Sequence, residues 1–317
     1  MKNISKILVL LLVMVLVSGV SAFAQKKITV GFAQIGAESE WRTANTTSMK
    51  AAAADAGIDM KFADAQQKQE NQIKAIRSFI AQKVDVILLA PVVETGWETV
   101  LKEAKSAKIP VILCDRMVSV KDDSLYLTHI GSDMLEEGKR AAIWLLGYLH
   151  TDKQVNIVEL QGTTGSGPAI DRQKGFKFIL SAFPNYKIIR SQTGDFTRAK
   201  GKEVMEAFLK DVGKDINVLF AHNDDMGIGA IRAIEEFGLK PGKDITIVSI
   251  DGVKGAFQAM KDGKLNVSVE CSPLLGPQVM QAVKDIVAGK SLPKNITTNE
   301  GVFPAETAAA VFPTRTY

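Results

Sequence analysis

Val111-Ile-Leu-Cys-Asp-Arg-Met117 is an apolar run that follows Ile109-Pro110 and ends in an adjacent acid and base. An apolar run of this length after a helix-like segment is typical of a buried strand in a parallel sheet. Open α/β sheets bind ligands at the carboxyl ends of such strands. Asp115 and Arg116 would then lie at the mouth of a cleft, where a carboxylate and a guanidinium suit an uncharged polyhydroxylated molecule such as a sugar. The alternative is an exposed ion pair in a loop.

A regular alternation of strand-like runs and helical patterns extends from this stretch in both directions. Toward the N-terminus, apolar runs at 28–33, 59–62 and 84–90 alternate with helical spacing that ends near residues 56, 82 and 106. After a polar segment at 119–124, a second round of the pattern begins at 127–130 and continues to 245–250. The pattern predicts an α/β fold with two doubly wound lobes, each a parallel sheet with helices on both faces.

The N-terminus has the pattern of a secretory signal peptide over residues 1–24. Lys2 and Lys6 precede the apolar run from Ile7 to Val17, and small residues surround a predicted cleavage site after Ala24. The run is too short for a comfortable transmembrane helix, so we expect the mature chain to lie outside the cytoplasm. The net charge of +4 comes from Lys and Arg interspersed with Asp and Glu, which argues against nucleic-acid binding.

Motifs for enzymatic chemistry are lacking in this sequence. The glycine-rich segment 162–167 does not have the Gly-Lys-Ser/Thr ending of a phosphate-binding loop, and we interpret it as a strand-to-helix turn. The histidines at 129, 150 and 222 have no metal-ligand spacing. We therefore predict that the protein is not an enzyme and has neither a cofactor nor a metal. Cys114 and Cys271 are expected to be unpaired buried thiols, with a disulfide as the alternative.

Further polar and aromatic residues follow strand-like runs. Asn223 and Asp224 come after the strand ending at Ala221, Asp251 follows the strand ending at Ile250, and Glu270 closes the run 265–270. Each could instead be a helix cap or a turn residue, Asp224 in particular. Trp41 and Phe196 lie in loops after strands, where an aromatic face can stack on the apolar side of a sugar ring; core packing is the alternative.

The assembled residues resemble the periplasmic sugar-binding proteins of bacterial ABC importers, in the branch that includes the ribose-binding proteins. The likeness covers essentially the whole mature chain. The segments that carry it are Asp115-Arg116, His129-Ile-Gly-Ser-Asp133, Asp171-Arg172, Gly194-Asp-Phe-Thr-Arg198, Ala221-His-Asn-Asp-Asp-Met226 and Ile250-Asp-Gly252. Three more segments are similar to galactofuranose-binding members of that family: 66–73, 90–97 and 191–198.

The resemblance implies two Rossmann-like lobes joined by a three-strand hinge, the type I periplasmic binding protein fold. It places the first lobe at residues 25–129 with 273–301 and the second at 130–272 with 302–317. It further implies a site for a monosaccharide between the lobes, formed by Trp41, Arg42, Asp115, Arg116, Arg172, Phe196, Asn223 and Asp251, with Gln34, Glu38 and Glu270 as further contacts.

The function implied by the resemblance is that of a monomeric periplasmic receptor. It would capture galactofuranose or a related hexose or pentose and deliver it to an ABC permease in the inner membrane. Where ribose binders carry Gln on the last hinge strand, this chain has Cys271 with Glu270 beside it. Such departures favour a larger or differently configured sugar than ribose. The alternative function is a sugar sensor that feeds a chemoreceptor or a histidine kinase.

Overall fold

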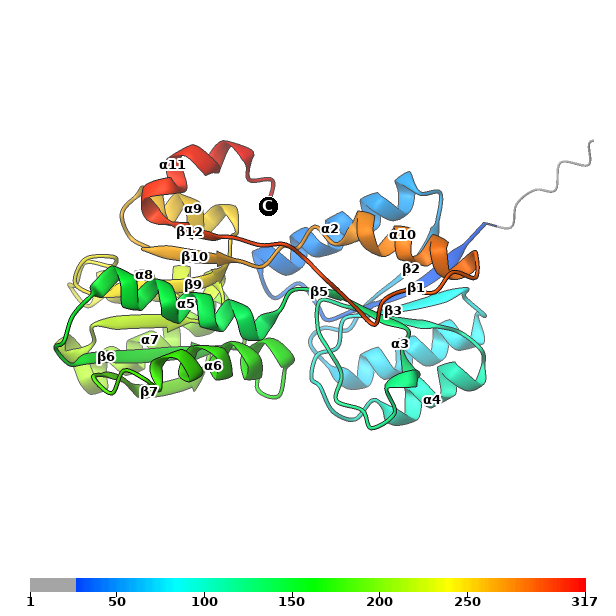
Figure 1. The fold of residues 1–317 in the computed structure, drawn as a ribbon, viewed down its shortest axis with the longest axis horizontal. Helices are drawn as coiled ribbons and strands as arrows, with labels where there is room; N and C mark the ends of the chain where they lie inside the picture. The colour runs from blue at the N-terminus through cyan, green and yellow to red at the C-terminus, as the bar shows by residue number, and fades with distance from the viewer. Residues whose placement is uncertain (1–26) are drawn as a thin grey trace, which may run out of the picture.

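The computed structural model describes residues 27–317, so the predicted signal peptide lies outside the described residues. Two α/β lobes lie side by side, and the chain passes between them (Figure 1). Each lobe is built on a six-stranded sheet. The predicted fold class is therefore confirmed.

The first lobe contains a wholly parallel sheet in the order β11-β5-β4-β3-β1-β2. Its strands are β1 (Thr29–Gln34), β2 (Asp59–Asp64), β3 (Val86–Leu89), β4 (Val111–Cys114), β5 (Thr128–Gly131) and β11 (Asn295–Thr297). Its helices are α2 (Glu40–Asp55), α3 (Gln69–Ala81), α4 (Glu98–Ser106) and α10 (Gly276–Val287). Apolar residues of α2 and α10 form one buried cluster with the sheet, and those of α3 and α4 form another, so helices cover both faces.

The second lobe has a sheet in the order β12-β10-β9-β8-β6-β7, in which only the β10–β12 pair is antiparallel. Its strands are β6 (Val155–Gln161), β7 (Tyr186–Thr193), β8 (Val218–Ala221), β9 (Thr246–Asp251), β10 (Val267–Glu270) and β12 (Val302–Pro304). Its helices are α5 (Met134–Leu149), α6 (Gly167–Leu180), α7 (Arg198–Val212), α8 (Asp224–Glu236), α9 (Lys254–Lys261) and α11 (Ala308–Val311). Helices α5 and α6 pack against each other, as do α7 and α8.

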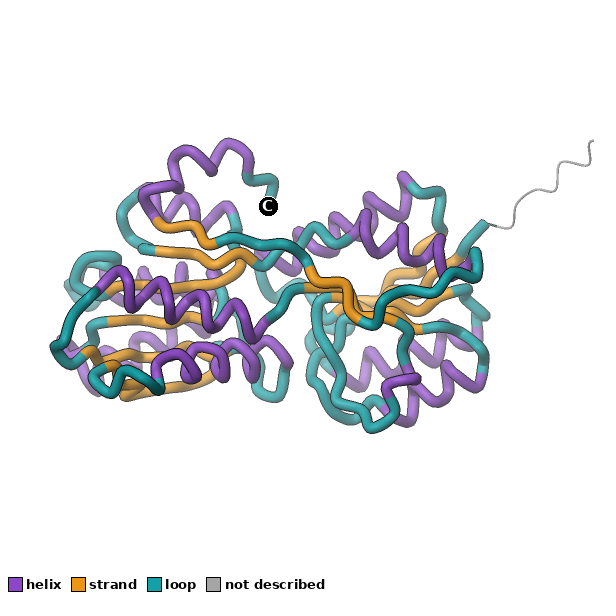
Figure 2. The backbone as a smooth tube through the Cα atoms, in the orientation of Figure 1, coloured by secondary structure: helices purple, strands orange, loops and turns teal. Residues whose placement is uncertain are grey.

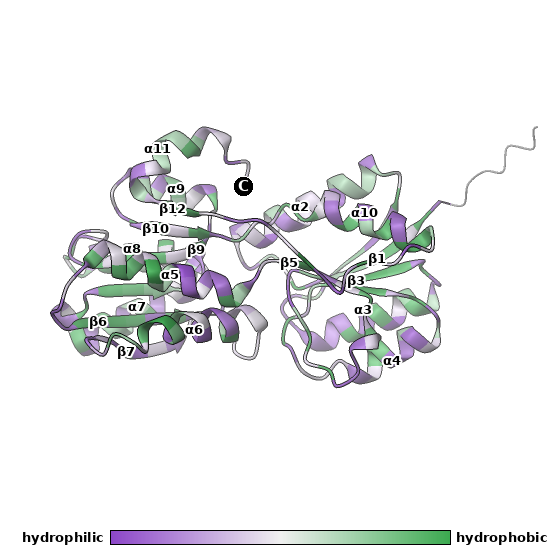
Figure 3. Ribbon diagram, in the orientation of Figure 1, coloured by the Kyte–Doolittle hydropathy of each residue, from purple (hydrophilic) through white to green (hydrophobic). Residues whose placement is uncertain are grey.

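The central strands are apolar along their whole length because both faces of each sheet are covered. Every residue of β3, β4 and β8 is buried, and β1, β3 and β6 are largely in the hydrophobic colour in Figure 3. Cys114 and Cys271 are buried free thiols, which confirms the prediction. In residues 27–317, no helix combines the length and apolar character that crossing a bilayer requires.

Three passages of the chain connect the lobes: one after β5, one after β10 and one between β11 and β12. They run close together between the two sheets (Figure 2). The strands assign Thr128–Gly131 to the first sheet and Val302–Pro304 to the second. The residue limits of the two lobes given above remain a prediction.

Candidate ligand-binding site

A narrow cleft lies between the lobes, where the carboxyl ends of the two sheets face each other. The residues that line it are Glu38, Ser39, Trp41, Arg42, Asp115, Arg116, Pro168, Arg172, Phe196, Asn223, Asp251 and Cys271. Both lobes contribute charged side chains that are almost completely buried. A buried charge is stable only when it is paired. The partners of each charged side chain therefore show which groups remain available to a ligand.

Arg42 organises the half of the cleft that belongs to the first lobe. It lies on the first turn of α2, where Ser39 caps the helix by accepting a hydrogen bond from the Arg42 amide. The guanidinium donates to Asp115 Oδ2 at 2.7 Å, to Glu38 Oε1 at 3.0 Å and to Gln34 Oε1 at 3.4 Å. Burial opposes its charge, but the two carboxylates together raise the pKa of Arg42 above its ordinary value.

Arg116 is held much more loosely than Arg42. It donates to the Val92 carbonyl at 3.1 Å, whereas its Nε lies 3.7 Å from Asp115 and its Nη2 lies 3.9 Å from Glu38. Burial and the neighbouring Arg42 lower the pKa of Arg116 to about 10. Arg116 therefore has the longest ion-pair distances of the three arginines in the cleft, and its buried Nε has no hydrogen-bond partner within residues 27–317.

Arg172 is the central cation of the second lobe and is firmly bound. From α6, it donates to Glu137 Oε2 at 2.7 Å, to the His222 carbonyl at 2.6 Å and to Asp251 Oδ1 at 3.4 Å. Burial opposes its charge, but the carboxylates of Glu137 and Asp251 raise the pKa of Arg172 above its ordinary value. Arg172 and Arg116 are thus chemically alike but differ in how well they are paired.

Three of the lining residues have a positive backbone φ, which is rare for residues other than glycine. The angles are 67° at Asp115, 60° at Phe196 and 132° at Asp251. Strained backbone of this kind is concentrated at ligand sites, where surrounding contacts hold it. At Phe196 the ring needs the space left by Gly162, since a Cβ on that glycine would lie 1.8 Å from the ring carbon Cζ.

Asn223 and Asp224 support the cleft in different ways. Asn223 caps α8 by accepting from the Met226 amide at 3.0 Å, and its side-chain nitrogen donates to the Phe196 carbonyl at 3.1 Å. Asp224 is a buried acceptor, and the cap that was the alternative for it is supplied by Asn223. It accepts hydrogen bonds from Ser249, from Ser268 at 2.8 Å and from the Val253 amide at 2.9 Å, and so holds the turn that follows Asp251.

Asp224 should make the stability of the fold depend on pH. Burial raises the pKa of Asp224 to about 7, above the unfolded value of about 3.9. The stabilisation linked to its protonation is complete below the unfolded pKa and is lost as the pH rises through the folded pKa. Relative to Asp224→Asn, we expect the wild type to lose about 2 kcal/mol of unfolding free energy between pH 5 and pH 8. Urea titrations at both pH values measure it, and a constant difference would contradict the assignment.

Glu300 joins the three passages between the lobes. Its Oε1 accepts from Ser132 Oγ at 2.6 Å, from the Ser272 amide at 2.7 Å and from Thr298 Oγ1 at 2.7 Å. These donors come from the first, second and third passage respectively. One carboxylate therefore fixes the hinge segments relative to one another.

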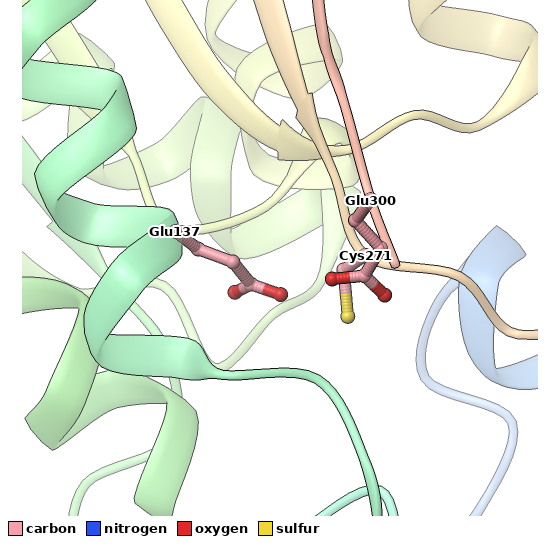
Figure 4. A group of neighbouring side chains, drawn as sticks. All are labelled: Glu137, Cys271 and Glu300. Carbon is pink, nitrogen blue, oxygen red and sulfur yellow. The ribbon is translucent and has the colours of Figure 1, made fainter. Parts of the chain in front are cut away.

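The hinge meets the cleft at Cys271, which lines the cleft and lies near Glu137. In Figure 4, Cys271 and Glu300 lie next to each other and Glu137 points toward them from α5. Potential ligand atoms of the three residues lie within 4.8 Å of one another. However, Glu137 is paired with Arg172, Glu300 Oε1 already accepts three hydrogen bonds, and burial raises the pKa of the Cys271 thiol well above its ordinary value. We interpret the group as a cluster of neighbouring side chains where the hinge meets the cleft and not as a metal site, since a metal would need a deprotonated thiol.

The structure brings nine of the predicted site residues together on the cleft surface. These are Glu38, Trp41, Arg42, Asp115, Arg116, Arg172, Phe196, Asn223 and Asp251. Gln34 lies behind them, where its amide nitrogen donates to Asn45 at 2.9 Å and its oxygen accepts from Arg42.

Glu270 does not line the cleft, contrary to its place in the predicted set. Its carboxylate accepts from Arg315 Nη1 at 2.6 Å, from the Tyr317 hydroxyl at 3.2 Å and from the Gly301 amide at 3.0 Å. Neighbouring residues of an extended segment point in opposite directions, so Cys271 reaches the cleft while Glu270 faces the C-terminus.

Sequence reasoning also missed Cys271, Ser39 and Pro168 as lining residues. Ser39 is the N-cap of α2, and Pro168 lies in the first turn of α6. Both are ordinary helix-start signals. In this fold those helices begin beside the cleft, so the same signals could have placed both residues there.

Comparison with known proteins identifies the family. Residues 30–291 match the model described as periplasmic binding protein domain. The chain belongs to this periplasmic binding protein family. The galactofuranose-binding protein YtfQ of Escherichia coli (strain K12) is 54% identical over 284 residues, which are 89% of either chain.

Solved structures of periplasmic binding proteins are equally similar. A crystal structure of a galactofuranose-binding protein has a TM-score of 0.89 and 53% identity, covering 91% of this chain and 98% of that one. The binding component of the arabinose ABC transporter from Shewanella sp. ANA-3, bound to α- and β-L-arabinofuranose, has a TM-score of 0.88 and 56% identity, covering 91% and 95%. These relatives are binding proteins, and the chain is likewise a binding protein and not an enzyme.

Proposed function

We propose that this protein is a periplasmic receptor that binds a furanose sugar in the cleft between its lobes and delivers it to an ABC permease. Galactofuranose, or a hexose or pentose of similar shape, is the proposed ligand. Relatives that are more than half identical over about nine tenths of the chain bind galactofuranose or arabinofuranose, according to their names. A monomer is proposed, because one chain supplies both halves of the cleft.

The observation that carries this proposal is the balance of charge in the cleft. Three cationic side chains, Arg42, Arg116 and Arg172, face three acidic ones, Glu38, Asp115 and Asp251. A ligand with a net charge would upset this balance in a buried site at considerable cost. A neutral ligand with many hydroxyl groups can instead hydrogen-bond to both signs.

Two buried atoms in the cleft define where hydroxyl groups should bind. Among the described residues, Glu38 Oε2 and Arg116 Nε are buried without a hydrogen-bond partner. One is an acceptor and the other a donor, so hydroxyl groups can satisfy both by donating to Glu38 and accepting from Arg116. The rings of Trp41 and Phe196 supply apolar surface for the C–H face of the sugar.

Delivery to a permease is supported more strongly than a sensory role. The arabinofuranose-bound relative is a component of an ABC transporter. The sensory alternative has no comparable support among the relatives that are more than half identical. Genes for a permease and an ATPase beside the coding gene would support delivery.

A panel of ligands tests the proposed function. We expect galactose, arabinose and fucose, which contain some furanose at equilibrium, to raise the melting temperature of the mature protein, because a ligand that binds only the folded state stabilises it. Galacturonate and galactosamine are matched charged controls and should have no effect. Carbon-13 NMR of bound, labelled galactose should then show the furanose ring. Binding of the charged sugars, or of the pyranose form alone, would refute the assignment.

A further inference from the structure

Outside the cleft, three charged residues connect the lobes at the cleft rim. Glu40 is the first residue of α2 in the first lobe, and its amide donates to Asp225 Oδ2 of α8 at 2.8 Å. Arg198, the first residue of α7, donates to Asp225 Oδ1 from Nε at 2.9 Å and from Nη2 at 2.6 Å. The same Nη2 lies 3.3 Å from Glu40 Oε2. We call Glu40, Arg198 and Asp225 the rim network.

The rim network combines two favourable electrostatic contacts across the lobes. The first amides of a helix have no partner within it, and the helix dipole favours an anion there. Asp225 supplies that anion to α2 from the other lobe, and its side chain is only 5% exposed. Arg198 is tied to Asp225 within the second lobe, so separation of the lobes would break only the contacts with Glu40.

The surfaces around the rim network are shaped for this contact. A Cβ on Gly255, near the start of α9, would lie 2.8 Å from Glu40 Oε2. A side chain at position 255 would therefore displace the Glu40 carboxylate from its position near Arg198 when the lobes are together. At another interlobe contact, the Glu94 amide donates to the Gly165 carbonyl at 3.0 Å, in the glycine-rich turn 162–166. The rim network thus lies at a fitted interlobe contact.

We propose that the rim network holds the lobes together around the bound sugar and sets how long the sugar stays, although none of its residues lines the cleft. This inference rests on the proposed function. Asp225 and Arg198 are positioning residues: they act through Glu40 and α2 to keep the two lobes together. Contacts that exist only when the lobes are together shift the equilibrium toward that state and slow release more than they affect capture.

The test is the rate of sugar release from Asp225→Ala. We expect dissociation about tenfold faster than in the wild type, with an association rate within about twofold, because a charge-assisted contact at a helix N-terminus is lost. Stopped-flow tryptophan fluorescence with galactose measures both rates. Asp225→Asn keeps an acceptor for the Glu40 amide but loses the charge, so it should release sugar at an intermediate rate.

A control and a second variant separate this role from a general loss of stability. Lys264→Ala breaks an exposed pair with Glu235 on the same helix as Asp225, without reaching the first lobe, and should release sugar at the wild-type rate. Gly255→Leu leaves Asp225 intact but places a side chain against Glu40, and it should also speed release. Wild-type release rates in both Asp225→Ala and Gly255→Leu would overturn the proposal.

The experiments distinguish an error in the rim-network proposal from an error in the proposed function. If the wild type binds no sugar of the panel, the proposed function fails. The rim network is then tested by spin labels on exposed positions of the two lobes, Lys102→Cys and Lys187→Cys. A smaller population of short interlobe distances in Asp225→Ala would support the rim network, and equal populations would overturn it.

Discussion

Arg116→Ala is expected to weaken sugar binding about a hundredfold or more while leaving the fold about as stable as the wild type. Arg116 has a buried Nε without a partner and only long contacts with Asp115 and Glu38. The sugar should complete these hydrogen bonds, and losing a buried charged donor typically costs about 2–5 kcal/mol of binding free energy. In the sugar-free protein, burial and Arg42 lower the pKa of Arg116, so its charge does not stabilise the fold.

Calorimetric titration with sugar and urea unfolding of the sugar-free protein measure the two effects. Arg77→Ala is a suitable control, because Arg77 forms an exposed ion pair with Glu103 on the same lobe and should change neither quantity by more than about 1 kcal/mol. Unchanged affinity in Arg116→Ala would remove this residue from the site. A large loss of stability would show that the sugar-free fold depends on its charge.

Much of the fold could be predicted because its strands carry an unambiguous signal. Runs such as Val111–Cys114 are apolar throughout, which happens when a parallel sheet is covered on both faces. Their alternation with helices leaves few possible topologies. The ends of helices were harder to predict. Helix α6 already begins at Gly167, the last residue of the segment 162–167 predicted to be a turn, and Pro168 belongs to its first turn.

The site could be predicted where it depends on strand ends and not where it depends on tertiary pairing. Asp115 and Arg116 follow β4 directly and Asp251 is the last residue of β9, so the edge of each sheet places them in the cleft. Glu137 lies within α5, and only the packing of α5 on α6 shows that it holds Arg172. In the sequence, Asp225 is an ordinary acidic residue in the first turn of α8. Only the structure shows that it accepts a hydrogen bond from the Glu40 amide of the first lobe.

Arg172→Ala is expected to abolish sugar binding and, unlike Arg116→Ala, to lower the free energy of unfolding by about 3 kcal/mol or more. Removing one partner of a buried ion pair leaves an uncompensated charge. Here the loss would strand Glu137, whose other oxygen Oε1 is already without a partner among the described residues, and would weaken the support of Asp251. Urea unfolding and calorimetric titration of the variant measure the two losses.

The cause of this instability can be separated from a simple cavity effect. Glu137→Gln in the Arg172→Ala background removes the stranded charge without refilling the space, so it should recover about 1 kcal/mol or more of the lost stability. Arg190→Ala, which breaks an exposed pair with Asp211 in the same lobe, should cost less than about 1 kcal/mol. If the double variant is no more stable than Arg172→Ala, then packing and not charge pairing explains the loss. We infer that Arg172 stabilises the second lobe, whereas Arg116 contributes to sugar binding and not to stability. If Arg172→Ala is as stable as the wild type, this difference between the two arginines is wrong.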